Sequence, residues 1–185
     1  MNNPSRFIVL VEDEHHEMLI RRYLKIRYRL NEHQMRMKRC PLGRGAAEGW
    51  VRKQFPEEIK AYRRRQAKAQ TGLIFMIDAD AHTLRERLSQ LEQALTESNQ
   101  RRVDEHERVA QLVPKRNVET WILCLNDESG LDENTDYTGT QRDWHLLIPS
   151  AAENLCQWSQ SPTGLPAYCL NSLQIGVQEL RRLKS

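Results

Sequence analysis

Acidic residues end two of the apolar, strand-like runs in the sequence. Glu12 ends the run at 6–12, and Asp78 and Asp80 form a D-x-D motif at the end of the run at 72–78. The carboxyl ends of parallel strands meet at one edge of a sheet, so we expect these carboxylates to lie close together. Like charges repel unless a cation neutralises them, and hard oxygen ligands suit Mg²⁺ or Mn²⁺. The pattern predicts a site for one or two of these ions at Glu12, Asp78 and Asp80.

A further acidic residue, Glu119, stands near the start of an expected helix, in the segment PKRNVETWIL. Parallel-sheet geometry brings it toward the same edge, which makes it a catalytic candidate. Lys115 and Arg116 beside it are candidates to hold a phosphate. An equally open interpretation is a glutamate that favours the helix dipole, next to two surface bases.

The neighbouring polar residues have plainer interpretations. Asp13 and Glu14 fit the solvated first turn of a helix, where carboxylates are favourable. His15, His16 and His82 lie near the acids in the sequence and would be able to touch a metal or a substrate. We interpret them as surface histidines.

The rest of the chain supplies the elements that must position these residues. Apolar runs predict strands at 6–12, 34–39, 72–78 and 108–113. Amphipathic spacing predicts helices at 14–30, 46–69, 83–98, 118–125, 150–158 and 167–183. We expect a kink or restart at Pro56, capping boxes at Thr83 and Ser150, a turn at 41–45 and a polar loop at 127–142. The alternation predicts an α/β fold with a mostly parallel sheet flanked by helices, divided into a metal-binding domain at 1–125 and a helical extension at 126–185.

The charge distribution suggests a polyanionic partner. The net charge of the 185 residues is only +3, but the segments at 21–44 and 52–68 are strongly basic and the segment at 127–143 is acidic. Arg63, Arg64 and Arg65 form a cluster that we expect to bind a nucleic-acid backbone. The alternative is that these arginines solvate the outer face of a helix.

The four cysteines form no CxxC pair, which favours free thiols in a reducing compartment. No basic leader and no apolar stretch of membrane-spanning length is present in the sequence. We therefore expect a cytoplasmic protein without a membrane partner.

The sequence resembles a known family at several of these motifs. VLVEDEHHEMLIRRYL is similar to the opening strand and helix of Toprim domains, and IFMIDAD is similar to their D-x-D strand. PKRNVETWIL and NSLQIGVQELRRL resemble segments of small stand-alone Toprim-like proteins related to the overcoming-lysogenisation-defect nucleases. Asp13 departs from the pattern, because it stands where Toprim domains usually have a glycine that permits a tight turn.

The resemblance implies Mg²⁺-dependent cleavage of nucleic-acid phosphodiesters, with DNA favoured over RNA. It places Glu12, Asp78, Asp80 and Glu119 in the catalytic site, with Glu12 as a candidate general base. It also implies an effector subunit of an anti-phage system that acts in a hetero-oligomer with a separate ATPase. The alternative is a non-catalytic scaffold or sensor subunit of such a complex.

Other functional classes find less support in the sequence. LVEDE also opens many response-regulator receiver domains, but the distance to Asp78 is too long and no Lys-Pro follows a later strand. The sequence contains no G-x-S-x-G, Walker or G-x-G-x-x-G motif, so nucleophilic hydrolysis and nucleotide binding by this chain are disfavoured.

Overall fold

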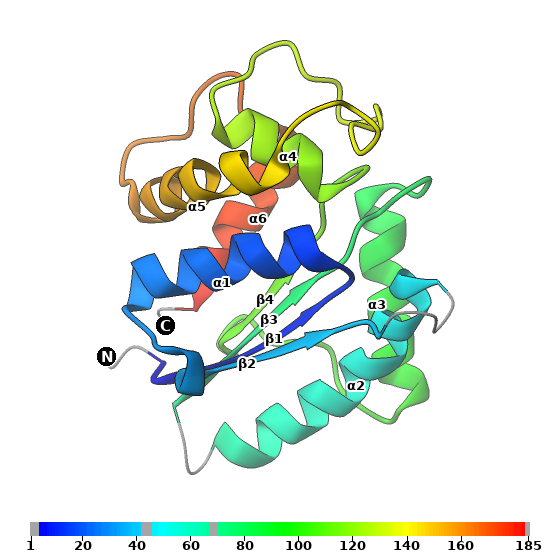
Figure 1. Cartoon of the computed structure of the whole chain (residues 1–185). Helices are drawn as coiled ribbons and strands as arrows, with labels where there is room; N and C mark the ends of the chain where they lie inside the picture. Colours follow the sequence, from blue (N-terminus) through cyan, green and yellow to red (C-terminus); the bar gives the residue numbers. More distant parts are fainter. Residues whose placement is uncertain (1–3, 42–45, 67–69, 184–185) are drawn as a thin grey trace.

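The computed structural model describes residues 4–41, 46–66 and 70–183, which form one parallel sheet with helices on both faces (Figure 1). The strands are β1 (Arg6–Val11), β2 (Met35–Arg39), β3 (Thr71–Met76) and β4 (Val109–Leu112), in the spatial order β2-β1-β3-β4. All three strand pairs are parallel. The predicted α/β fold is therefore confirmed.

Helices cover both faces of the sheet because the inner strands are apolar on both sides. Phe7, Val9 and Val11 of β1 point into one core, while Ile8 and Leu10 point into the other. The first core is covered by α1 (Glu14–Tyr28), α4 (Val118–Leu125), α5 (Trp144–Gln160) and α6 (Asn171–Arg182). The second is covered by α2 (Ala47–Gln66) and α3 (Leu84–Glu97) (Figure 1). A short 3₁₀ helix, Glu32–Gln34, precedes β2.

The segments at 1–125 and 126–185 share one hydrophobic core. Leu155 of α5 and Leu173 of α6 lie in the same core as Leu19 of α1 and Trp121 of α4. The predicted polar loop is confirmed as an irregular segment between α4 and α5, at 126–143. A hydrogen bond links the middle of this segment to α6, because Glu133 accepts from the backbone N of Ser172, 2.9 Å away, at the start of that helix.

Several boundaries differ from those predicted. The expected capping box at Ser150 is wrong, because α5 begins at Trp144, is capped by Asp143 and continues through Pro149. We expected a kink or a restart at Pro56, and α2 is a single helix without a restart there; α6 begins at Asn171. The capping box at Thr83 is confirmed, with Glu86 N 3.2 Å from Thr83 Oγ1. Most of the expected turn at 41–45, and the end of the helix predicted at 46–69, lie outside the described residues.

None of the described helices combines the length and apolar character that crossing a membrane requires.

Candidate active site at the carboxyl edge of the sheet

Glu12 and Asp78 lie side by side where β1 and β3 end. The two strands are paired in register from Arg6 with Thr71 to Val11 with Met76, so the residues that follow them leave the sheet together. Glu12 Oε1 accepts a hydrogen bond from the backbone N of Asp78, 2.8 Å away. Asp78 is buried, with 7% of its surface exposed. The convergence that the parallel sheet predicts for these two residues is present.

His16 is the cationic partner of this carboxylate pair. Its ring is fully buried, with Nδ1 2.8 Å from Asp13 Oδ1 and Nε2 3.0 Å from Asp78 Oδ1. Burial by itself lowers the pKa of His16, but the charges of Asp78 and Asp13 outweigh it and raise the pKa well above the ordinary value. We therefore describe His16 as an imidazolium that donates to both carboxylates.

The interpretation of His16 as a surface histidine is wrong. A signal for its burial is present in the sequence, because His16, Leu19, Ile20 and Tyr23 follow the i, i+3, i+4, i+7 spacing of one helix face. Asp13, half-exposed, caps α1 by accepting a hydrogen bond from the backbone N of His16 at 3.1 Å. Its backbone is extended, at φ −137° and ψ −169°, so this position does not need the glycine that the Toprim pattern has there.

The two central carboxylates resist ionisation. Burial raises the pKa of Glu12 to about 8, and the nearby charges of Asp78 and Asp80 add to the effect while His16 opposes it. Burial raises the pKa of Asp78 to about 6, against the opposing charge of His16. An additional cation near carboxyl groups with raised pKa values would stabilise their charged form.

Asp80 leaves the sheet on the side of α3, where Arg87 holds it. Its backbone lies in the left-handed region at φ 54°, which aspartate tolerates better than most residues. Its Oδ2 is 3.4 Å from Nη2 of Arg87, a guanidinium that is 1% exposed and that also pairs with Glu48. The sequence analysis did not select Arg87, although it falls on the buried stripe of α3 with Leu91 and Leu95. A buried arginine requires such partners, so Arg87 fixes the turn that carries Asp80.

Glu119 is joined to His15. His15 Nδ1 lies 2.6 Å from Glu119 Oε1, and the glutamate is 3% exposed while a quarter of the His15 side chain is exposed. The hydrogen bond raises the pKa of His15 despite its partial burial. Glu119 therefore lies in the first turn of α4 as a buried residue with a specific partner, and His15 is not an isolated surface histidine.

The predicted phosphate-binding residues beside Glu119 lie near the same edge. Lys115 Nζ donates to the backbone oxygen of His82 at 2.9 Å and so reaches the turn that follows Asp80. Arg116 is 3.6 Å from Asp136 of the irregular segment. His82 itself is exposed, as expected.

The Arg63–Arg65 cluster does not behave as one unit. Arg63 forms a bidentate ion pair with buried Glu107, with Nε 2.8 Å from Oε1 and Nη2 3.0 Å from Oε2. The expectation that Arg63 faces a nucleic acid is corrected, because its guanidinium joins the end of α2 to the loop before β4. Arg64 and Arg65 are exposed.

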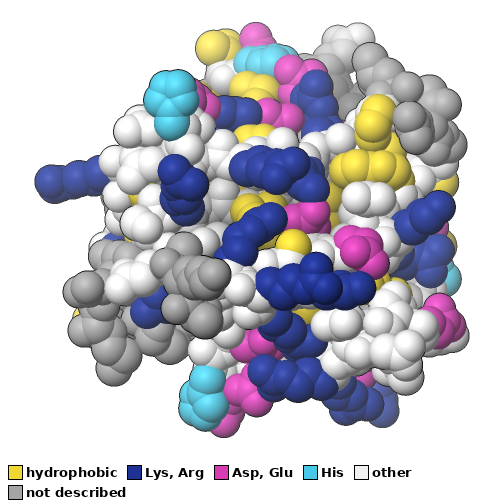
Figure 2. Space-filling model, turned by 90° about the horizontal axis from the view of Figure 1, so that it is seen from below, with side chains coloured by type: hydrophobic (Ala, Val, Ile, Leu, Met, Phe, Trp, Pro, Cys, Tyr) yellow, Lys and Arg dark blue, Asp and Glu magenta, His cyan; other side chains and the backbone are white. Residues whose placement is uncertain are grey.

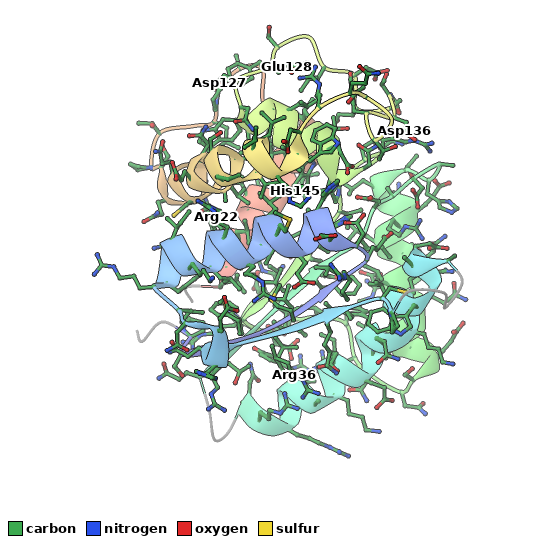
Figure 3. The ribbon with its side chains drawn as sticks, viewed as in Figure 1. Arg22, Arg36, Asp127, Glu128, Asp136 and His145 are labelled. Atoms are coloured by element: carbon green, nitrogen blue, oxygen red, sulfur yellow. The ribbon has the colours of Figure 1, made fainter. Side chains whose placement is uncertain are left out.

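Arginine and lysine side chains gather on the face below α2 and β2, where Figure 2 shows them across the middle of the molecule. The irregular segment at the opposite end carries Asp127, Glu128 and Asp136 (Figure 3). On the basic side, a hollow of about 300 Å³ is lined in part by Arg6, Arg36 and Arg65. The exposed basic residues of β2 and α2 are Arg36, Arg39, Lys53, Lys60, Arg64 and Arg65.

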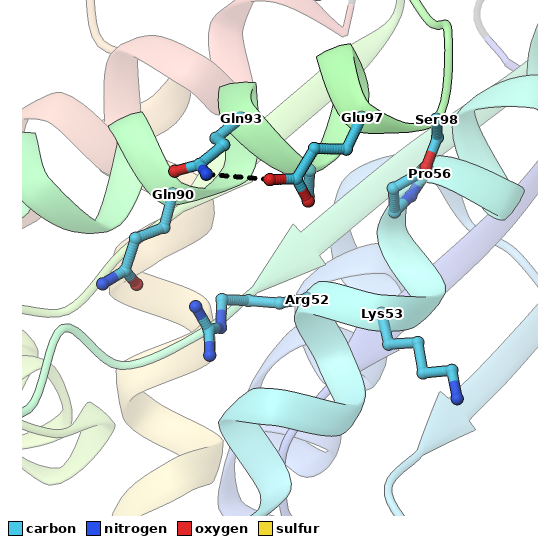
Figure 4. Close-up of a pocket in the computed structure, with 8 residues that line it drawn as sticks. Arg52, Lys53, Pro56, Gln90, Gln93, Glu97 and Ser98 are labelled. Atoms are coloured by element: carbon cyan, nitrogen blue, oxygen red, sulfur yellow. Dashed lines mark hydrogen bonds between the residues drawn. The ribbon is translucent and has the colours of Figure 1, made fainter.

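A larger groove, of about 470 Å³, runs between α2 and α3 (Figure 4). Arg52 and Lys53 line one side, and Gln90, Gln93 and Glu97 line the other. Gln93 Nε2 donates to Glu97 Oε1 at 2.8 Å. None of the carboxylates at the sheet edge lines this groove, so it is separate from the candidate active site.

The carboxylates at the sheet edge do not form a preorganised metal-binding site. In the described part of the chain, no three histidine, cysteine or acidic side chains are gathered closely enough to hold an ion. Carboxylate oxygens are nevertheless suitable ligands for Mg²⁺, because that ion keeps several waters and commonly binds only one or two carboxylates. The described hydrogen bonds use one oxygen each of Glu12, Asp78 and Asp80.

Comparisons with protein-family models, curated proteins and solved structures found no match. The proposals below therefore rest on the geometry and chemistry of the site.

Proposed function

We propose that this chain hydrolyses nucleic-acid phosphodiesters with the help of Mg²⁺ or Mn²⁺, as a nuclease of the Toprim type. The observation that carries the proposal is the contact between Glu12 and Asp78, two partly or fully buried carboxylates at the carboxyl edge of a parallel sheet. Burial raises the pKa of both side chains, so a bound cation would stabilise the ionised form of each. Asp80 approaches the same edge from the side of α3, and its charge acts on Glu12.

Asp78 and Asp80, with Glu12 beside them, would hold the metal. When bound, the ion would neutralise charge on the phosphate and lower the pKa of water. Glu12 would act as the general base that takes a proton from the attacking water. Its pKa near 8 favours this role, because a base works best when its pKa lies near the operating pH. His16 and Arg87 would keep Asp78 and Asp80 oriented, as hydrogen-bonded partners do for metal ligands.

Nucleic acid would reach this edge along the basic face. Lys115 and Arg116 lie near the carboxylates, and the basic residues of β2 and α2 lie further along. Contacts of this kind bind the phosphate backbone without reading the bases. We propose DNA as the substrate, and a cytoplasmic location.

Arg36 and Arg65 should contribute to DNA binding, whereas Arg63 should contribute to the stability of the fold. Replacing Arg36 and Arg65 together with Ala should weaken binding to DNA and reduce the salt dependence of log K by about 0.9 per lost phosphate contact. Arg63→Ala should instead lower the melting temperature, because it removes the closest cationic partner of buried Glu107 and leaves only the more exposed Arg101. Fluorescence anisotropy with labelled DNA at several salt concentrations measures the first effect, and calorimetry measures the second. Unchanged affinity and slope in the double variant would assign these arginines to a solvated face.

Mg²⁺ should stabilise the fold. Ionisation of Glu12 costs folding free energy as the pH rises from its ordinary pKa near 4.5 towards 8, because the folded state retains a proton that the unfolded state has lost. Metal relieves this cost, so its effect should grow between pH 6 and pH 8. At a concentration 100 times Kd the gain is about 2.7 kcal/mol, or roughly 5–10 °C in melting temperature.

Thermal melts with Mg²⁺ and with EDTA test the metal site, and variants localise the effect. Asp78→Asn should abolish the shift. Glu105→Gln removes the same charge from an exposed position in the loop before β4, at the other edge of the sheet, and should retain the shift. A midpoint that does not move at millimolar metal would remove the basis for the nuclease proposal.

We also propose that the chain works in an anti-phage complex beside a separate ATPase subunit, which the Toprim resemblance supports. A second candidate function is a non-catalytic scaffold or sensor in such a complex. One observation favours it: His16 and Arg87 already neutralise Asp78 and Asp80 without a metal. A scaffold would cleave no nucleic acid in any condition, yet it would bind its partner equally well with and without the carboxylates, and this combination separates the two candidates.

A further inference from the structure

The bond between His15 and Glu119 lies across the end of the strand that carries Asp78. His15 stands in the first turn of α1, which follows β1, and Glu119 in the first turn of α4, which follows β4. Since β3 lies between β1 and β4, a contact between these two helix starts must cross the carboxyl end of β3. Asp78 is two residues beyond β3, and the charge of Glu119 acts on it.

The two ring nitrogens of His15 have different surroundings. Nδ1 donates to buried Glu119, while the ring lies 6.1 Å from the ring of Trp144 and 6.2 Å from that of His145, measured between centroids. No described hydrogen bond uses Nε2 of His15. In a recurring catalytic arrangement, a buried carboxylate orients a histidine through one ring nitrogen, and the second ring nitrogen transfers a proton to or from the substrate.

We propose that His15 is the general acid of the phosphodiester cleavage, with Glu119 as the residue that positions it. This inference rests on the proposed function. The water oxygen forms a bond to phosphorus as Glu12 takes its proton. The bond between phosphorus and the leaving oxygen breaks, its electron pair stays on that oxygen, and the oxygen takes the proton from Nε2 of His15. The imidazole is left neutral and regains a proton from solvent.

The groups around His15 favour its protonated form on balance. The hydrogen bond and charge of Glu119 raise its pKa, as does the charge of Asp13, while partial burial and the charge of His16 lower it. From α5, His145 and Trp144 face the ring. An imidazole whose pKa is raised is protonated more of the time, and a protonated imidazole can deliver a proton to a leaving group.

A substrate that does not need a proton on its leaving group tests this role. His15→Gln should slow cleavage of a DNA strand by about 10²-fold or more, the usual contribution of general acid catalysis. The same variant should cleave p-nitrophenyl thymidine 5′-phosphate at nearly the wild-type rate, because p-nitrophenolate leaves unprotonated. Glu119→Gln should shift the alkaline limb of the pH–rate profile on DNA to lower pH. His106→Gln, at an exposed position in the loop before β4, serves as the control.

The possible outcomes separate this inference from the proposed function. Equal losses on both substrates, or none on DNA, would overturn the role of His15 and leave the nuclease proposal standing. A wild-type chain that cleaves neither substrate, alone or with an ATPase partner, would overturn both. NMR titration of His15 provides a readout without turnover: Glu119→Gln should lower its pKa, and an unchanged value would contradict the pairing.

Discussion

Asp78→Asn and Asp80→Asn should each reduce the rate of nucleic-acid cleavage by about 10²-fold or more, or roughly 3 kcal/mol of transition-state stabilisation. Each change keeps the side-chain volume and removes the charge through which a carboxylate holds a catalytic metal. Single-turnover cleavage of labelled DNA with Mn²⁺ measures the loss. Glu105→Gln should match the wild type, since its side chain is 84% exposed in the loop before β4.

The two aspartates differ in what else they support, and the folding of each variant must be measured alongside its rate. Asp78 is a partner of the buried His16 imidazolium, so Asp78→Asn also disturbs a charged hydrogen bond. The Asp80 side chain is half-exposed and pairs with Arg87 at 3.4 Å, so Asp80→Asn should disturb the fold less. A loss of rate in Asp80→Asn at unchanged melting temperature therefore assigns the effect to chemistry. Cleavage by both variants at the wild-type rate would contradict the catalytic proposal.

His16→Gln should be among the most destabilising single changes in the protein. It removes the cation between Asp13 and Asp78 and leaves buried Asp78 without a charged partner. Breaking a buried ion pair from one side typically costs about 3–5 kcal/mol. Urea denaturation of the wild type and the variant measures the difference, and His106→Gln, which alters an exposed side chain, should change stability by less than about 0.5 kcal/mol.

The pH dependence of this difference has a definite sign. The pKa of His16 is raised in the folded state, so the stabilisation from its charge is complete below the ordinary pKa near 6.5 and is lost as the pH rises through the raised value. The double variant His16→Gln, Asp78→Asn should cost less than the sum of the single changes, because it removes both members of the pair. A cost that is additive and independent of pH would indicate packing rather than charge.

The sheet and the meeting of Glu12 with Asp78 were predictable because both follow from local patterns. Apart from Thr71, the buried positions of β1 and β3 carry no polar side chain, which is the pattern of strands covered on both faces. Once the strands are parallel, residues just beyond their ends share an edge. The extent of α5 was not predictable in this way, because Pro149 and Ser150 imitate a helix start while tertiary packing keeps them inside the helix.

The cations of the site were harder to predict than its acids. Charged and imidazole side chains are usually exposed, so His16 was interpreted as a surface residue and Arg87 was not selected, although both lie on the buried face of a helix. Their partners come from elements far apart in the sequence, such as Asp78 for His16 and Glu48 for Arg87. Only the folded chain brings these charges together, and the same holds for Glu107, which removes Arg63 from the basic surface.

Cleavage of supercoiled plasmid and of single-stranded DNA by the wild-type chain is the most direct test of the proposed function. The reaction is run with Mn²⁺, with Mg²⁺ and with EDTA, in the presence and absence of an ATPase encoded nearby. We predict nicked and shortened products that require the metal, that appear in at least one partner condition and that disappear with Asp80→Asn. Intact DNA in every condition, or cleavage that persists in EDTA or in Asp80→Asn, would contradict a metal-dependent nuclease site formed by Glu12, Asp78 and Asp80.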